Sequence, residues 1–124
     1  MTNKLNILVL EDELVRREWF NKIFFTDNID FCFTAEKAIK LLQNNQYDLV
    51  FLDRDLGDTS DTNNNGEKVA LEIMKQKLNL NATIVIHTMN DYGQKTMRSY
   101  LEKTHNVENI PYTLLLKLKR EDFN

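Results

Sequence analysis

Two short apolar segments of this chain each end in acidic residues, and this pattern restricts its fold more than any other feature. Residues 7–10 are followed by Glu11 and Asp12, and residues 49–52 are followed by Asp53. Uninterrupted apolar runs of this length are typical of strands buried on both faces of a parallel sheet. If the two strands are neighbours, the three acids meet at the carboxyl edge of the sheet, where open α/β sheets bind ligands.

Such a cluster of acids is unfavourable unless something neutralises it. At about 5 Å and an effective dielectric constant near 20, each pair of charges repels by roughly 3 kcal/mol. The cluster therefore needs a bound cation or a raised pKa. Oxygen ligands with room left for water suit Mg²⁺, so the sequence predicts a site for Mg²⁺, or for Mn²⁺ in its place.

Length and composition predict one ordinary globular domain spanning residues 1–124. The 16 basic and 19 acidic residues give a net charge of −3, which argues against broad binding of nucleic acid but leaves a narrow basic patch open. Because Cys32 is the single cysteine, an intramolecular disulfide is excluded, which fits a reducing compartment. We expect Cys32 to be a small buried hydrophobic residue. Without a membrane-spanning run or a signal peptide, we expect a cytoplasmic protein with no membrane partner.

Strand-like and helix-like patterns alternate along the chain. The last helix is expected to be short, and the fourth to be capped by Asn90 or Asp91. This alternation predicts an α/β fold, a three-layer α/β/α sandwich around a parallel sheet. The expected strands are residues 5–11, 29–33, 49–53, 83–87 and 107–110, and the expected helices are residues 14–24, 35–43, 67–77, 91–103 and 114–120.

These residues resemble the receiver domain of bacterial two-component response regulators over almost the whole chain. Glu11, Asp12 and Asp53 match the acids that hold Mg²⁺ in that family, where the third-strand aspartate accepts a phosphoryl group. Thr88 matches the hydroxyl residue that contacts the phosphoryl oxygen, if the loop before Gly66 is longer than usual. The resemblance implies a doubly wound five-stranded sheet of order 2-1-3-4-5.

One position departs from the receiver pattern. The fifth strand of receivers ends in Lys-Pro, whereas this chain has Ile110-Pro111. The usual counter-charge to the phosphoryl group is therefore absent, which argues against ordinary switching by phosphorylation.

A narrower resemblance fits this departure. Residues 52–57 and 86–93 are similar to those of the receiver-like group named for processing cyclic phosphates. That group carries a second acid, here Asp55, a His-Ser/Thr-x-Asn segment, here residues 87–90, and an arginine early in the first helix, here Arg16. The resemblance implies phosphate chemistry near a metal.

The residue types permit that chemistry. An imidazole side chain has an unperturbed pKa near 6.5, so His87 would serve as general acid or base at neutral pH. Hydroxyl, amide and helix N-terminal groups bind phosphate oxygens, and arginine supplies positive charge. We assign metal binding to Glu11, Asp12, Asp53 and Asp55, phosphate binding to Thr88, Asn90 and Arg16, and catalysis to Asp53, His87 and Thr88.

Simpler roles compete with these assignments. His87 would be only a hydrogen-bonded strand end, Asn90 only a helix cap, Arg16 only a solvated side chain and Asp55 only a turn former. His105 has no motif around it and is expected to be exposed.

Residues 61–66, with Glu72 beyond them, also satisfy the spacing of an EF-hand calcium loop. The context disfavours that interpretation, because an EF-hand needs a helix entering the loop and a strand precedes this one.

Three function hypotheses follow. The first is a signalling module phosphorylated on Asp53 and read by a partner protein, and the second is a metal-dependent phosphoesterase acting on a cyclic or terminal phosphate with His87 as acid or base. The third is a pseudo-receiver that only binds a protein. The expected partner is accordingly a phosphate-containing small molecule or a protein, with nucleic acid only as a phosphate-bearing substrate.

Overall fold

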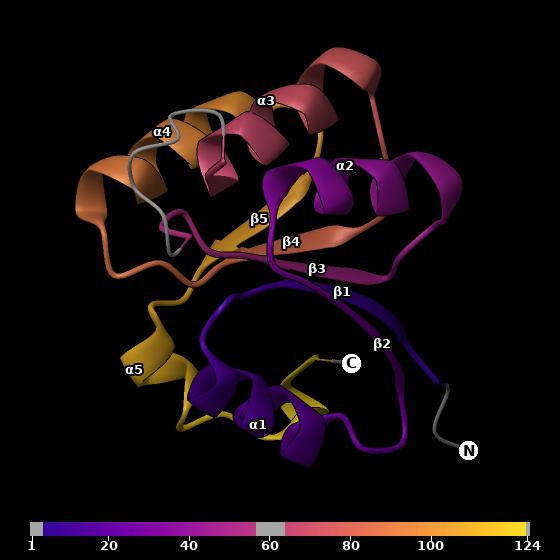
Figure 1. Cartoon of the computed structure of the whole chain (residues 1–124), viewed down its shortest axis with the longest axis vertical. Helices are drawn as coiled ribbons and strands as arrows, with labels where there is room; N and C mark the ends of the chain where they lie inside the picture. The colour runs from indigo at the N-terminus through magenta and orange to yellow at the C-terminus, as the bar shows by residue number, and fades with distance from the viewer. Residues whose placement is uncertain (1–3, 57–63, 124) are drawn as a thin grey trace.

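The computed structural model describes residues 4–56 and 64–123. Strands and helices alternate along the described chain, and Figure 1 shows the layers that they form. The elements are β1 (Asn6–Leu10), α1 (Leu14–Ile23), β2 (Asn28–Cys32), α2 (Ala35–Asn44), β3 (Leu49–Leu52), α3 (Gly66–Gln76), β4 (Thr83–Ile86), α4 (Asp91–Leu101), β5 (Asn106–Asn109), α5 (Tyr112–Leu115) and the 3₁₀ helix η1 (Arg120–Phe123).

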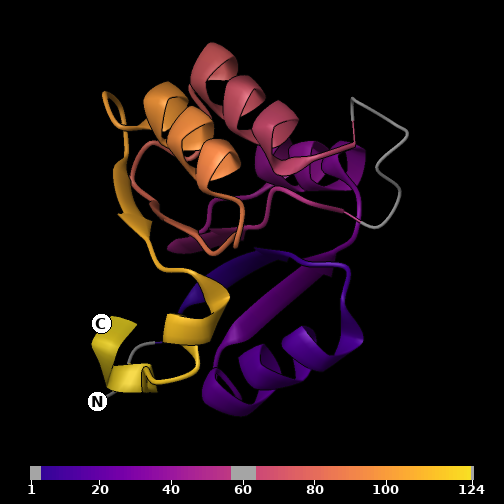
Figure 2. The ribbon, with the colours of Figure 1, turned by 90° about the vertical axis from the view of Figure 1, so that its left-hand side faces the viewer.

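The sheet has five strands in the order β2-β1-β3-β4-β5, and every neighbouring pair is parallel. Helices α1 and α5 lie on one face, and α2, α3 and α4 lie on the other (Figures 1 and 2). This arrangement confirms the expected doubly wound α/β fold and its strand order. In such a sheet the carboxyl ends of β1, β3 and β4 are neighbours, which places the loops that follow them at one edge.

Each face of the sheet carries its own apolar cluster because alternate residues of a strand point to opposite faces. Leu8 and Leu10 of β1 pack on the side of α2, α3 and α4. Ile7 and Val9 pack on the side of α1, with Phe20 of that helix. All four β1 side chains are fully buried, as their apolar run predicts, and each contributes roughly 1.5–3 kcal/mol to folding.

Side-chain caps fix where three helices begin. Thr34, Asn65 and Asn90 each accept a hydrogen bond from the backbone amide three residues later, at the starts of α2, α3 and α4. Asn90, and not Asp91, therefore caps α4. A cap of this kind stabilises a helix by about 1 kcal/mol.

The expected helix at residues 114–120 is wrong in its extent. The chain forms one turn, α5, and then the separate helix η1. The break places Arg120 against Asp27, where Arg120 Nε donates to Asp27 Oδ2 at 2.7 Å. Phe123 packs on the α1 side of the sheet, so tertiary contacts of the C-terminal segment replace the continuous helix.

The expectation that His105 is exposed is also wrong. His105 is 7% exposed, and its Nε2 lies 2.8 Å from the carbonyl oxygen of Leu78. Its Nδ1 lies 2.8 Å from Thr104 Oγ1, so both ring nitrogens have partners. The residue ties the end of α4 to the loop after α3 and has a structural role.

Cys32 is buried as expected, and burial raises the pKa of its thiol to about 12. A thiol with such a pKa is not a reactive nucleophile at neutral pH. Within the described residues, no helix combines the length and the apolar character that crossing a bilayer requires.

Candidate functional site

The first two acids of the site meet because β1 and β3 are adjacent. Leu10 pairs with Leu52 at the end of the β1–β3 ladder, which places Glu11 beside Asp53. The amide of Asp53 donates to the carbonyl of Leu10 at 3.3 Å. The parallel register, and not a local motif, therefore brings together two carboxylates that are 42 positions apart, as the sequence predicts.

His87 joins them from the next strand. Its amide donates to the carbonyl of Leu52 at 3.0 Å, which continues the β3–β4 ladder and sets His87 next to Asp53. Its Nε2 lies 3.0 Å from Glu11 Oε1. Because a carboxylate only accepts hydrogen bonds, this contact places a proton on Nε2.

These three side chains form a compact buried group. Glu11 is 0% exposed, Asp53 4% and His87 0%. One possible metal-ligating atom from each residue lies within 4.8 Å of the other two. Among the described residues, this is the group of acidic, histidine and cysteine side chains that converges as a metal site would require.

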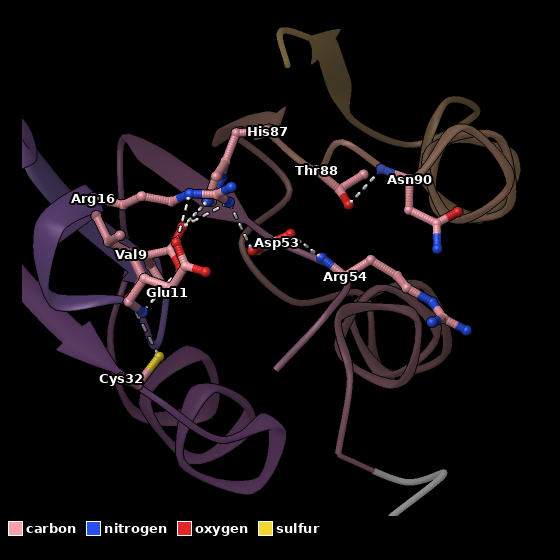
Figure 3. A network of polar contacts seen from close by, with 10 residues as sticks. Val9, Glu11, Arg16, Cys32, Asp53, Arg54, His87, Thr88 and Asn90 are labelled. Carbon is pink, nitrogen blue, oxygen red and sulfur yellow. Dashed lines mark hydrogen bonds and ion pairs between the residues drawn. The ribbon is translucent and has the colours of Figure 1, made fainter. Parts of the chain in front are cut away.

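Arg16, in the first turn of α1, closes this group from the side of that helix (Figure 3). Its Nη1 lies 3.5 Å from Asp53 Oδ2 and 3.7 Å from Glu11 Oε1. Its Nε makes a shorter ion pair, 2.9 Å, with Glu13 Oε2, and its guanidinium carbon lies 4.6 Å from the centre of the Tyr112 ring. Arg16 is therefore part of the site rather than a solvated surface residue.

The two carboxylates respond differently to this environment. Burial raises the pKa of Glu11, but the hydrogen bond and the charge of His87 outweigh it, so the net shift is downward. Burial also raises the pKa of Asp53, and the negative charge of Glu11 adds to that effect against His87 and Arg16, so the net shift is upward. A raised pKa marks Asp53 as the acid whose charge is less well compensated by protein groups.

Thr88 and Asn90 lie in the loop between β4 and α4, on the other side of Asp53 from Glu11 (Figure 3). Thr88 is buried, and its Oγ1 accepts a hydrogen bond from the amide of Asn90 at 3.1 Å. Asn90 Oδ1 accepts from the amide of Gly93 at 2.9 Å. Asn90 thus has the capping role, and both residues belong to the loop that follows β4.

Two predicted metal ligands lie outside the converging group. Asp12 is half-buried, and Asp55 is 48% exposed in its side chain. Asp55 Oδ1 accepts a hydrogen bond at 2.9 Å from Arg54 Nη1. The Nη2 atom of Arg54 forms an ion pair with Glu67. The structure therefore brings together Glu11 and Asp53 with His87, and places Asp55 in a neighbouring ion-pair network.

Gly66 is a supporting residue that sequence reasoning did not assign to the site. A Cβ added there would lie 2.1 Å from the carbonyl oxygen of Asp53. The amide of Gly66 donates to the carbonyl of Arg54 at 3.0 Å, so the start of α3 presses directly against the end of β3. The long gap between Asp53 and Gly66 in the sequence hid this contact.

The alternative calcium loop gains no support from the residues that can be described. Residues 61–63 lie outside the described range. Asn64 Oδ1 accepts from the amide of Ala35, and Asn65 Oδ1 caps α3. Glu72 pairs with Lys68 and Lys75 along α3, so its carboxylate is engaged on the helix surface.

Comparisons with known proteins support the fold. No curated protein matches the sequence. The receiver domain of Francisella response regulator 1452 has a TM-score of 0.70 at 15% identity, covering 98% of this chain and 94% of that one. The Mn(2+)-bound form of response regulator Rcp1 has a TM-score of 0.69 at 16% identity, with 94% and 90% covered. At such identities the likeness concerns the fold.

A third structure is more similar in sequence. The response regulator protein TrrA from Thermotoga maritima, in complex with Mg(2+)-BeF, is 29% identical, with a TM-score of 0.62 and with 87% of this chain and 86% of that one covered. A family model matches residues 6–103, which hold β1 to α4 and every residue of the converging group. The chain therefore belongs to the family described as the Cyclic-phosphate processing Receiver domain.

Proposed function

We propose that this domain binds a divalent cation in the pocket of Glu11 and Asp53 and recognises a phosphoryl group beside it. The observation that carries the proposal is the convergence of three buried ligand groups within 4.8 Å at the carboxyl edge of the sheet. The Mn(2+)-bound form of Rcp1 and the Mg(2+)-BeF complex of TrrA support it by analogy, because both are receivers of the same fold.

The donor set fits a divalent cation. Two buried carboxylates and an imidazole satisfy the ligand preferences of Mn²⁺, and the carboxylates alone satisfy those of Mg²⁺. Without a cation, Asp53 accepts a hydrogen bond from the amide of Arg54 at 2.8 Å, but its ion pair with Arg16 is long, at 3.5 Å. When bound, the cation would neutralise these acids and polarise a phosphoryl oxygen.

The remaining residues would hold the phosphoryl group. The loop of Thr88 and Asn90 leads into the N-terminus of α4, whose first amides favour anions. Arg16 faces the same pocket from α1 and supplies the positive charge that Ile110 does not. A phosphoryl group between these elements would contact cationic or N–H groups on both sides of Asp53.

The reaction that we propose is hydrolysis of a cyclic phosphate, the substrate class in the family description. Water adds to phosphorus, one ester P–O bond breaks, and the leaving oxygen takes a proton. Proton transfer by His87 stays a prediction: its ring is fully buried and bonded to Glu11, so it would act on a group inside the pocket.

A second candidate function is signalling through an aspartyl phosphate on Asp53. The position of Asp53 at the end of β3 favours it, with Oδ1 accepting from the amide of Arg54 at 2.8 Å and Oδ2 facing Arg16. Ile110 counts against it. A pseudo-receiver that only binds a protein would not need the buried acids.

Binding and turnover measurements test the proposal together. Mg²⁺ or Mn²⁺ should raise the melting temperature, beryllofluoride should raise it further, and Asp53→Asn should reduce both effects.

Nucleoside 2′,3′-cyclic phosphates should be hydrolysed only with metal, and His87→Ala should lower the rate by roughly 10²- to 10⁴-fold if the ring transfers a proton. Metal binding that survives Asp53→Asn but disappears in Asp61→Ala would contradict the proposal and favour the calcium loop.

A further inference from the structure

We infer that His87 is a direct ligand of the cation, so that the site selects a transition metal such as Mn²⁺ or Zn²⁺ over Mg²⁺. The inference rests on the proposed metal site, adds to it the identity of the third ligand and the class of metal, and gives His87 coordination in place of proton transfer. The receiver resemblance implies a site made of acids. Here the residue that the sheet register sets beside Asp53 is a histidine.

The first argument is geometric. The two carboxylates and the imidazole come from the ends of three adjacent strands, β1, β3 and β4, so rigid elements hold them. Glu11 Oε1 and His87 Nε2 are 3.0 Å apart, so an ion that displaces the proton between them would lie about 2.0–2.2 Å from each atom. The whole group spans no more than 4.8 Å, so small side-chain shifts would close it around an ion.

The second argument is that His87 is incompletely satisfied by the protein. Its ring is fully buried, and Nδ1 has no hydrogen-bond partner in the described part of the chain. By contrast, both ring nitrogens of buried His105 have protein partners. An incompletely bonded buried polar group is unfavourable, so structural stability alone does not account for His87.

Ligand chemistry then sets the class of metal. Mg²⁺ strongly prefers oxygen ligands and is bound mainly by carboxylates and water. Imidazole is a good ligand for divalent transition metals, whose affinities for mixed nitrogen and oxygen sites exceed that of a hard cation. Adding the ring of His87 to the carboxylates of Glu11 and Asp53 therefore shifts the preference away from Mg²⁺.

Arg16 provides a route for the ion. Its contacts with Asp53 and Glu11, at 3.5 and 3.7 Å, are longer than those of strong charge-assisted hydrogen bonds, which are about 2.7–2.9 Å. Its contact with Glu13 is 2.9 Å, and its side chain is 21% exposed. The guanidinium can thus move away from the two buried acids while it keeps its ion pair with Glu13. The positive charge of an entering cation then replaces that of Arg16 beside Glu11 and Asp53.

Pulsed electron paramagnetic resonance of the Mn²⁺-loaded full chain tests the inference directly. A histidine ligand gives ¹⁴N modulation from the coordinated nitrogen, and an all-oxygen site does not. We expect this signal in the wild type and in His105→Gln, which removes the other histidine, and its loss in His87→Gln. Because the wild-type spectrum already decides whether nitrogen is coordinated, the test does not depend on the folding of a variant.

Calorimetric titration with Mg²⁺ and Mn²⁺ gives the second readout. We expect the wild type to bind Mn²⁺ at least about tenfold more tightly than Mg²⁺, and His87→Gln, which offers an oxygen in place of the nitrogen, to reduce that ratio by about tenfold. Tight binding of Mn²⁺ without a ¹⁴N signal would overturn the inference and leave the proposed function standing. No binding of either metal would overturn both.

Discussion

Ile110 lies beside His87 at the end of the β4–β5 ladder. Ile86 pairs with Asn109, and the amide of Ile110 donates to the carbonyl of Ile86 at 2.9 Å. The side chain of Ile110 is half-buried and packs against the apolar cluster on the α1 side, so an apolar contact stands where receivers carry a lysine. Positive charge reaches Asp53 instead from Arg16, whose Nη1 lies 3.5 Å from Asp53 Oδ2.

The first prediction concerns phosphorylation of Asp53. Incubation with acetyl phosphate and Mg²⁺ should give weak or short-lived labelling, because no lysine stabilises the added charge. Any label should lie on Asp53, whose Oδ2 is the oxygen near Arg16. Intact mass measurement over time gives the extent, and Asp53→Asn is the control. A stable adduct of one phosphoryl group per chain would contradict the prediction and favour the signalling function.

The second prediction concerns Arg16. Arg16→Gln should bind Mn²⁺ about tenfold more tightly than the wild type, because the guanidinium no longer competes for Glu11 and Asp53. The same variant should bind beryllofluoride less well, since it lacks a counter-charge for the anion. Arg17→Gln is the matched control, because Arg17 lies over the Phe33 ring, 4.2 Å from its centre. Unchanged metal affinity in Arg16→Gln would refute the competition.

The sequence predicts much of this site because the site is determined mainly by where two neighbouring strands end. Buried apolar strands that end in acid reveal both the parallel sheet and the meeting of Glu11 with Asp53. The sequence does not reveal that Asp55 pairs with Arg54, because this ion pair depends on side-chain positions around a loop. It also cannot reveal the buried environment of His105, whose partner Leu78 is distant in sequence.

The third prediction concerns Gly66. Gly66→Ala should lower the free energy of unfolding by about 2 kcal/mol, because the new methyl group would meet the backbone of Asp53, which cannot move aside as a flexible side chain can. Metal affinity should fall as well, since the displaced backbone carries a ligand. Gly93→Ala is the matched control: the nearest atoms that its methyl group would meet belong to the side chain of Arg54 and not to backbone, so the loss should be smaller. Equal losses in urea unfolding would contradict this explanation.

The last prediction is a dependence of stability on pH that is separate from the site. Asp27 is 1% exposed in its side chain and accepts hydrogen bonds from Arg120, at 2.7 and 3.1 Å, and from the amide of Leu5, at 2.8 Å. Burial raises the pKa of Asp27, but these hydrogen bonds outweigh it, so the pKa in the folded state is below its ordinary value of 3.8. The ionised carboxylate therefore stabilises the fold above pH 3.8, and this contribution is lost as the pH falls through the lower folded-state pKa.

Asp27→Asn should accordingly lower the free energy of unfolding at neutral pH by about 2 kcal/mol, a smaller loss than for a fully buried pair because Arg120 keeps partial contact with water. The difference from the wild type should stay constant down to about pH 4 and shrink below that value. Asp48→Asn is the matched control, because Asp48 also accepts from an amide at the start of β1, at 2.8 Å, but is exposed. Urea unfolding measured from pH 7 to pH 3 checks this, and a difference that stays constant throughout would show that the ion pair does not set the acid sensitivity.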